Sequence, residues 1–163
     1  MHERPTAARH DQRARLLPLI AAALLLTAVP ARAGMGPLGF SAFGGWYTHP
    51  HDNLVGAGVH AGLGPITIVP NAEYVFVDGG KHYSLNLDAT WTLFPVGVAS
   101  GWVGGGLARH VFDPDSGPTD RRSGFDVIAG AGLNAVPLKP FIQFKVVVMD
   151  GDDPKAVTIG ARF

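Results

Sequence analysis

The chain of 163 residues has no cysteine, and only 16% of its residues carry a charge. Without cysteine, the protein can form neither a disulfide framework nor the thioether of a lipoprotein anchor. Long hydrophobic runs are scarce as well, since residues 16–30 form the single long uncharged apolar stretch. Its fifteen residues fall short of the roughly 20 that a spanning helix needs. The sequence therefore predicts no transmembrane helix.

Residues 1–33 instead have the three parts of a secretory signal peptide. Four arginines precede the apolar run "LLPLIAAALLLTAVP", and Ala31 and Ala33 follow it in an A-x-A pattern. A positive segment, an apolar segment and a small-residue cleavage site are typical of export signals. We expect cleavage after Ala33, which leaves residues 34–163 as one domain.

Removal of residues 1–33 changes the charge balance of the protein. Of thirteen basic and thirteen acidic residues, five basic and two acidic ones lie in this segment. The remaining chain has eight basic and eleven acidic residues, a net charge of −3. This acidic balance argues against nucleic acid as a partner.

The remaining chain is dominated by residues that alternate between polar and apolar. In "YSLNLDATWTL" every second side chain, from Ser84 to Thr92, is polar, and those between are mostly large and apolar. This period of two indicates a strand with two different faces, whereas a helix would mix them. Eight segments have this character: 38–48, 54–63, 66–77, 82–94, 97–112, 123–135, 141–149 and 156–163.

The connections between these segments alternate in length and charge. "HPHDN", "DGGKH", "DPDSGPTDRR" and "DGDDPK" are polar, whereas "GP", "FPV" and "AVPLKP" are short and nearly uncharged. Long polar loops at one end and short turns at the other are typical of outer-membrane barrels. The sequence therefore predicts an all-β fold, an eight-stranded antiparallel up-and-down transmembrane β-barrel.

Alternation alone does not say which face is inside, because a soluble lipocalin-like barrel buries its apolar face. That alternative, a periplasmic binder of a small apolar ligand, requires Leu85, Leu87 and Trp91 inside. Three acids and three bases within the strands favour a polar interior, where opposite charges pair in a lumen filled by side chains. These predicted lumen charges are Glu73, Asp88, Asp126, Arg109, Lys145 and Arg162.

Aromatic residues fall near the expected strand ends, as in the two interfacial girdles of a membrane barrel. Tyr83 and Trp91 share one face of a strand, eight residues apart. We expect Trp46, Tyr74 and Phe125 near the loop end of the barrel. We expect Trp91, Phe141 and Phe163 near the turn end.

The chain ends in "VTIGARF", a strand that finishes on Phe163. This ending resembles the C-terminal signature that outer-membrane barrels present to the barrel-assembly machinery. The whole chain after the signal peptide resembles, in architecture, the small eight-stranded barrels: the OmpA transmembrane domain, OmpX and the opacity-type proteins. The resemblance implies a bacterial outer-membrane location, outer-membrane lipid and lipopolysaccharide as partners, and Phe163 as an assembly signal. Its loops are shorter than those of adhesins.

Two groups of residues in the sequence are candidates for metal binding or catalysis. The loop segment "HPHD" has two histidines and an aspartate, but structural zinc sites use four ligands, and we expect no metal or other cofactor. His82 and Ser84 in "KHYSLN" partly resemble the His-x-Ser-Asn motif of the lipid A deacylases, which are also eight-stranded barrels. Residue 85, however, is leucine where the family has asparagine. We therefore expect a non-enzymatic structural or surface-interaction role, with a lipid A-modifying enzyme that uses His82 and Ser84 as the alternative.

Overall fold

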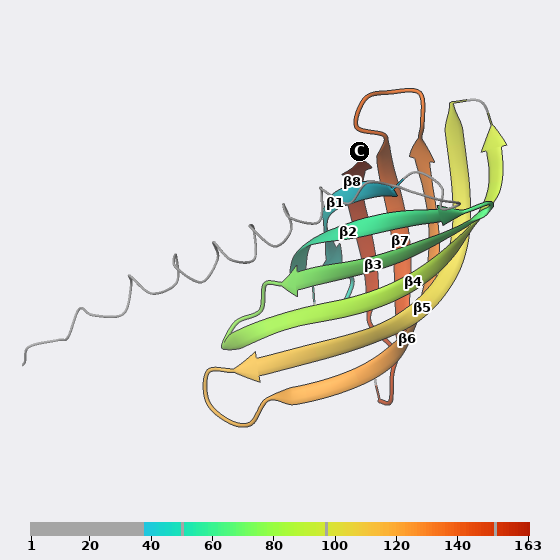
Figure 1. Ribbon diagram of the computed structural model, residues 1–163. Coiled ribbons are helices and arrows are strands. Elements are labelled where there is room, and N and C mark those ends of the chain that lie inside the picture. The colour runs from blue at the N-terminus through green and yellow to red at the C-terminus, as the bar shows by residue number, and fades with distance from the viewer. Residues whose placement is uncertain (1–37, 50, 97, 152) are drawn as a thin grey trace, which may run out of the picture. The chain divides into compact units, whose positions relative to one another are not determined.

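Eight antiparallel strands follow one another along the chain and close into a barrel in the computed structural model (Figure 1). The structure describes residues 38–49, 51–96, 98–151 and 153–163, so the predicted signal peptide lies outside the described residues. The strands are β1 (Leu38–Tyr47), β2 (Asn53–Leu63), β3 (Ile66–Val75), β4 (Gly80–Val96), β5 (Ala99–Pro114), β6 (Asp120–Leu133), β7 (Pro140–Val148) and β8 (Lys155–Arg162).

The barrel closes through the pairing of its first and last strands. The register of β1 against β8 runs from Ser41 opposite Arg162 to Tyr47 opposite Ala156. Beyond it, Phe40 and Phe163 exchange both backbone hydrogen bonds, at 2.7 and 2.9 Å. The last residue is thereby held by the sheet, which explains why the C-terminal strand does not fray.

All eight predicted segments are strands, and the fold class is confirmed. The main difference lies in the hairpins of β4, β5 and β6, which extend further than the alternation predicts. Phe112 pairs with Asp120 in the β5–β6 hairpin, and Lys81 pairs with Asp113 between β4 and β5. Asp113 and Asp120 therefore lie at strand ends rather than in loops. Backbone pairing continues past the alternating segment because ladder hydrogen bonds do not depend on side-chain character.

The two faces of the sheet are separated by chemistry, and the apolar face is outside. On β4, Ser84 and Asp88 are buried within the barrel. Leu85, Leu87 and Trp91, between 53% and 54% exposed, cover the exterior. A soluble barrel with these three side chains inside is therefore wrong for this chain. No helix among the described residues is long and apolar enough to cross a membrane.

The interior is not purely polar, because two apolar clusters occupy it as well. The loop-side cluster contains Tyr47, Leu54, Val75 and Ala156. The turn-side cluster contains Trp102, Ile128 and Phe141, and Phe43 packs against both clusters. Polar side chains therefore share the lumen with two apolar clusters.

Glycines on β5 make room for the side chains of the neighbouring strands. Gly106 stands between Asp88 on β4 and Asp126 on β6 in the strand register. A Cβ atom at Gly106 would collide with the carboxylate of Asp88 and with the backbone of Leu87. In contrast, a Cβ atom at Gly39, on β1, would meet its nearest neighbours at 3.6 and 3.8 Å, an ordinary contact.

We therefore expect Gly106→Ala to destabilise the barrel by about 1–3 kcal/mol, because overpacking displaces the β4 backbone. The matched variant Gly39→Ala should leave the free energy of unfolding nearly unchanged. Urea unfolding of the refolded protein in detergent micelles measures both. Equal effects of the two substitutions would contradict this account of the glycine.

Candidate functional site: the charged interior of the barrel

A buried ion pair crosses the middle of the barrel. Lys145 on β7 is 2% exposed, and its Nζ lies 2.5 Å from Oε1 of Glu73 on β3. The hydroxyl of Tyr47 on β1 donates to the other carboxylate oxygen of Glu73, at 3.2 Å. Three strands that are separated around the barrel are thus joined through its interior. An ion pair inside a barrel must be held in this way, because charges removed from water need close partners.

A chain of hydrogen bonds lines the adjoining wall of β3 and β4. Nδ2 of Asn71 donates to Asp88 at 2.7 Å, and Nδ2 of Asn86 donates to Asn71 at 2.8 Å. The hydroxyl of Ser84 donates to Oδ1 of Asn86 at 2.6 Å. Ser84 is therefore a donor within this chain, and its hydrogen bond is not directed at a histidine.

His82 belongs to a different contact near the loop end. Its Nε2 lies 3.2 Å from Nδ1 of His110 on β5, and its ring packs edge-on against Phe112. His82 and Ser84 thus point into the same lumen, but they do not bond to each other. His82 contacts His110, and Ser84 donates to Asn86. A nucleophilic serine requires a base within hydrogen-bond reach, and this arrangement does not pair them.

Asp126 is completely buried, and neither of its carboxylate oxygens has a hydrogen-bond partner among the described residues. One oxygen of Asp88 is in the same position. Asp126 stands opposite Val147, two residues from Lys145 on β7, and Gly106 alone separates Asp126 from Asp88 in the register. Together with Glu73, the centre of the lumen therefore holds three acidic side chains around one ammonium group.

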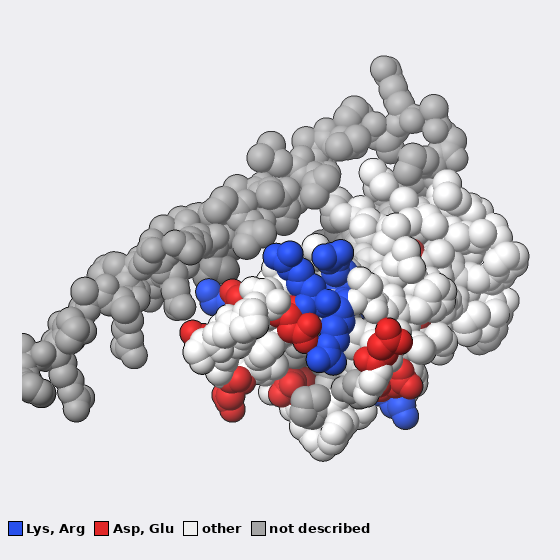
Figure 2. All heavy atoms as spheres, turned by 90° about the horizontal axis from the view of Figure 1, so that it is seen from below, with Lys and Arg blue, Asp and Glu red and all other residues white. Residues whose placement is uncertain are grey.

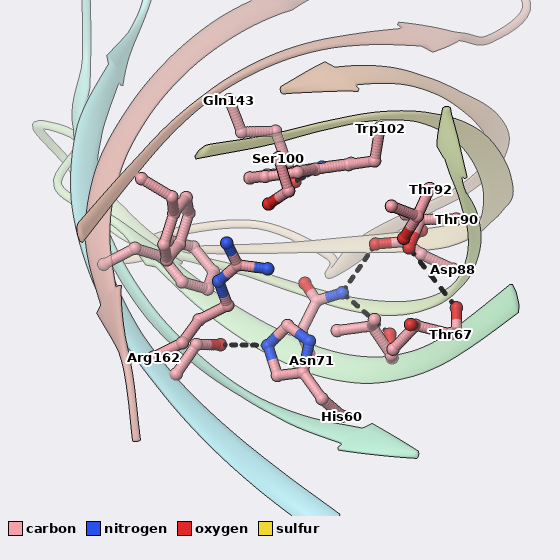
Figure 3. Close-up of a pocket in the computed structure, with 14 residues that line it drawn as sticks. His60, Thr67, Asn71, Asp88, Thr90, Thr92, Ser100, Trp102, Gln143 and Arg162 are labelled. Carbon is pink, nitrogen blue, oxygen red and sulfur yellow. Dashed lines mark hydrogen bonds between the residues drawn. The ribbon is translucent and has the colours of Figure 1, made fainter. Parts of the chain in front are cut away.

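The turn-side end of the lumen contains a cavity of about 60 Å³ (Figure 3). The guanidinium of Arg162 lies 4.6 Å from the ring centroid of Trp102 and 5.7 Å from that of Phe141. Stacking on aromatic faces suits arginine, whose planar cation is weakly hydrated. Nε2 of His60 and the hydroxyl of Ser41 are 2.9 Å apart on the same wall. Arg162 therefore lies inside, but far along the barrel from the central ion pair.

The structure corrects the prediction for Arg109, which lies on the outer face and is exposed. The inward residues of β5 are Trp102, Ala108 and His110. The glycines at residues 104–106 are neither polar nor large and apolar. Alternation along β5 therefore does not show which of its side chains point inward. The other five predicted lumen charges, Glu73, Asp88, Asp126, Lys145 and Arg162, lie within the barrel, so acids outnumber bases there by three to two.

Phe141 is a second correction, since it is buried against Trp102 rather than placed in an outer girdle. Phe141 lies on the same inward face of β7 as Gln143 and Lys145. The alternation of the sequence already indicated this placement. The other aromatic residues of the predicted girdles are exposed: Trp46, Tyr74, Tyr83, Trp91, Phe125 and Phe163. Trp102 was not recognised as an interior residue for the same reason as Arg109.

A metal site was not expected at "HPHD", and the described residues contain no group of three or more His, Cys, Asp or Glu arranged to hold an ion. Phe163 packs against Phe40 with ring centroids 6.5 Å apart. Its place at the outer wall of the closed barrel is compatible with an assembly signal, which remains a prediction.

Comparisons with known proteins agree with this architecture. The N-terminal β-barrel domain of OprF from Pseudomonas aeruginosa is similar at a TM-score of 0.67, with 16% identity, over 80% of this chain and 96% of that one. Neisserial surface protein A is similar at a TM-score of 0.63, with 12% identity, over 79% and 97%. The outer membrane enzyme PagL is similar at a TM-score of 0.50, with 16% identity, over 77% and 98%.

No protein-family model and no curated protein sequence matches the chain. The identities to the solved structures are low, so these similarities define the fold alone. The chain has the fold of the small eight-stranded outer-membrane β-barrels.

We expect removal of the central base to be the most damaging change in the lumen. Lys145→Met would leave three buried carboxyl groups without a cation, at a cost of about 3–5 kcal/mol. Glu73→Gln should cost less, because Lys145 keeps the buried carboxyl groups of Asp126 and Asp88 in the same lumen. The free energy of unfolding in micelles measures the difference.

Lys155→Met is the control, since Lys155 is exposed on β8 and forms no ion pair with another described residue. It should change stability by less than about 1 kcal/mol. A Glu73→Gln variant less stable than Lys145→Met would overturn the assignment of Lys145 as the organising charge.

Proposed function

We propose that this protein is a non-enzymatic barrel of the bacterial outer membrane, with a structural or surface-interaction role. The observation that carries the proposal is the side-chain packing of the interior. The Glu73–Lys145 pair and Tyr47 join three strands across the lumen. Two apolar clusters occupy the lumen as well. In a barrel of eight strands such packing favours a filled lumen over an open channel.

The outer wall supports the membrane location. Leu87, Leu107 and Val127 lie at mid-height of neighbouring strands and are each more than half exposed. Such a surface in water would be an aggregation hazard, whereas it matches the apolar band of a membrane barrel. Closure between β1 and β8 leaves no unpaired edge, as the hydrocarbon region demands.

The second candidate is a lipid A-modifying enzyme, which the similarity in fold to the outer membrane enzyme PagL keeps in consideration. Against it, Ser84 is fully buried in the lumen and donates to Asn86, while His82 contacts His110. A membrane lipid lies outside the barrel wall, so its ester bond would not reach this hydroxyl. The geometry therefore favours the non-enzymatic role.

The membrane location predicts that the protein fractionates with outer membranes and migrates differently on detergent gels before and after boiling. A closed barrel keeps its hydrogen bonds in detergent until it is heated. A soluble periplasmic protein without a mobility shift would contradict the proposal.

Ser84→Ala separates the two candidate functions. Under our proposal, cells that express the wild-type protein, the Ser84→Ala variant or no protein give the same lipid A mass spectrum. A change in lipid A mass that depends on wild-type Ser84 would establish the enzyme instead. Thr158→Ala, at another buried hydroxyl of the interior, is the control for a nonspecific loss of folding.

A further inference from the structure

Two arginines stand on the outer wall of the barrel at its loop end. Arg109 on β5 and Arg121 on β6 are exposed. The register places Arg121 opposite Val111, and Arg109 opposite Leu85 and Ser123. Seen from this end, several Lys and Arg side chains form a central basic group with acidic side chains on both sides, and other basic side chains lie apart from it (Figure 2).

Neither arginine has an acidic partner among the described residues. Of the neighbouring acids, Asp120 pairs with Arg122 at 2.9 Å, and Asp113 accepts a hydrogen bond from the hydroxyl of Thr119 at 2.8 Å. Arg121 stands directly opposite Val111, and Arg109 lies two residues before Val111 on the same face of β5. The two arginines are therefore diagonal neighbours on the outer face of adjacent strands.

A groove of about 370 Å³ begins directly below Arg109, on the side of the membrane centre. Leu85, Leu87 and Leu107 form its apolar wall, and Ser123 lies at the level of Arg109. Ser123 is small between larger neighbours, which leaves this hollow on the outer wall. An apolar groove with cationic groups at its upper end matches a lipid, with an acyl chain below and a phosphate above.

The depth of Arg109 places its charge close to the headgroup region of the membrane. Tyr83, at the loop-side girdle, stands two pairs nearer the loops than Leu85, the partner of Arg109. A charge on the lipid face inside the girdle is unfavourable unless it reaches the interface. The long arginine stem can extend to that level, where headgroup phosphates offer bidentate hydrogen bonds.

We propose that Arg109 and Arg121 bind the phosphate of an outer-leaflet glycolipid, lipopolysaccharide, whose acyl chain occupies the groove of Leu85, Leu87 and Leu107. The proposal rests on the proposed outer-membrane location. The loop end of such a barrel faces outward, so this site lies in the outer leaflet.

The test measures binding of fluorescently labelled lipopolysaccharide to the refolded barrel in detergent micelles by anisotropy. Replacing both arginines, Arg109→Gln with Arg121→Gln, should weaken binding at least roughly tenfold, because each base near a lipid surface contributes about 1 kcal/mol. The matched control, Lys139→Gln with Lys155→Gln, removes the same charge from exposed positions elsewhere and should bind as the wild type does.

Two further measurements identify the ligand. Ser123→Phe should fill the groove and weaken binding while both arginines remain. Lipopolysaccharide with its lipid A phosphates removed, and phosphatidylglycerol, should each bind much more weakly. Unchanged binding by the double arginine variant, or equal binding of any of these lipids, would overturn the proposal. The boiled and unboiled gel distinguishes this failure from failure of the barrel, since every variant should keep its mobility shift.

Discussion

Every peptide group of a barrel wall in lipid must find its hydrogen-bond partner within the sheet, and the rest of this structure depends on that constraint. The pairing of β1 with β8 meets it by removing the only two edges that an eight-stranded sheet would have. Phe40 and Phe163 extend the pairing to the last residue of the chain. The closed cylinder in turn determines how much space its interior offers.

A barrel of eight strands is narrow, so its interior side chains have to fill one another's gaps. The polar residues of the lumen therefore lie beside glycines and apolar clusters. Gly106 leaves room for Asp88 and Asp126, and the Glu73–Lys145 pair occupies the centre. Buried charges with poor access to water need near-complete pairing, which makes the organisation of the lumen sensitive to a single base.

The outside of the barrel is governed by lipid rather than by packing. Most outward positions are apolar and need no specific neighbour. Arg109 and Arg121 depart from that rule, because both carry a charge and are exposed on the outer face. The same narrow cylinder thus has an interior in which charges are buried around the Glu73–Lys145 pair and an outer wall on which two arginines are exposed.

The strand order, the strand count and the alternation of faces were predictable from the sequence by itself. Where polar and apolar residues alternate clearly, as in residues 82–92, the alternation predicts correctly which side chains point inward. It fails at residues 104–106, where three glycines carry no facial information, and the inward placement of Trp102 and the outward placement of Arg109 were missed there. Only the tertiary structure decided which carboxylate pairs with Lys145. It also decided that Ser84 donates its hydrogen bond to Asn86 rather than to His82. Alternation assigns a residue to a face, but the partner across a lumen depends on barrel closure and register, which bring residues such as Glu73 and Lys145 together over 72 positions.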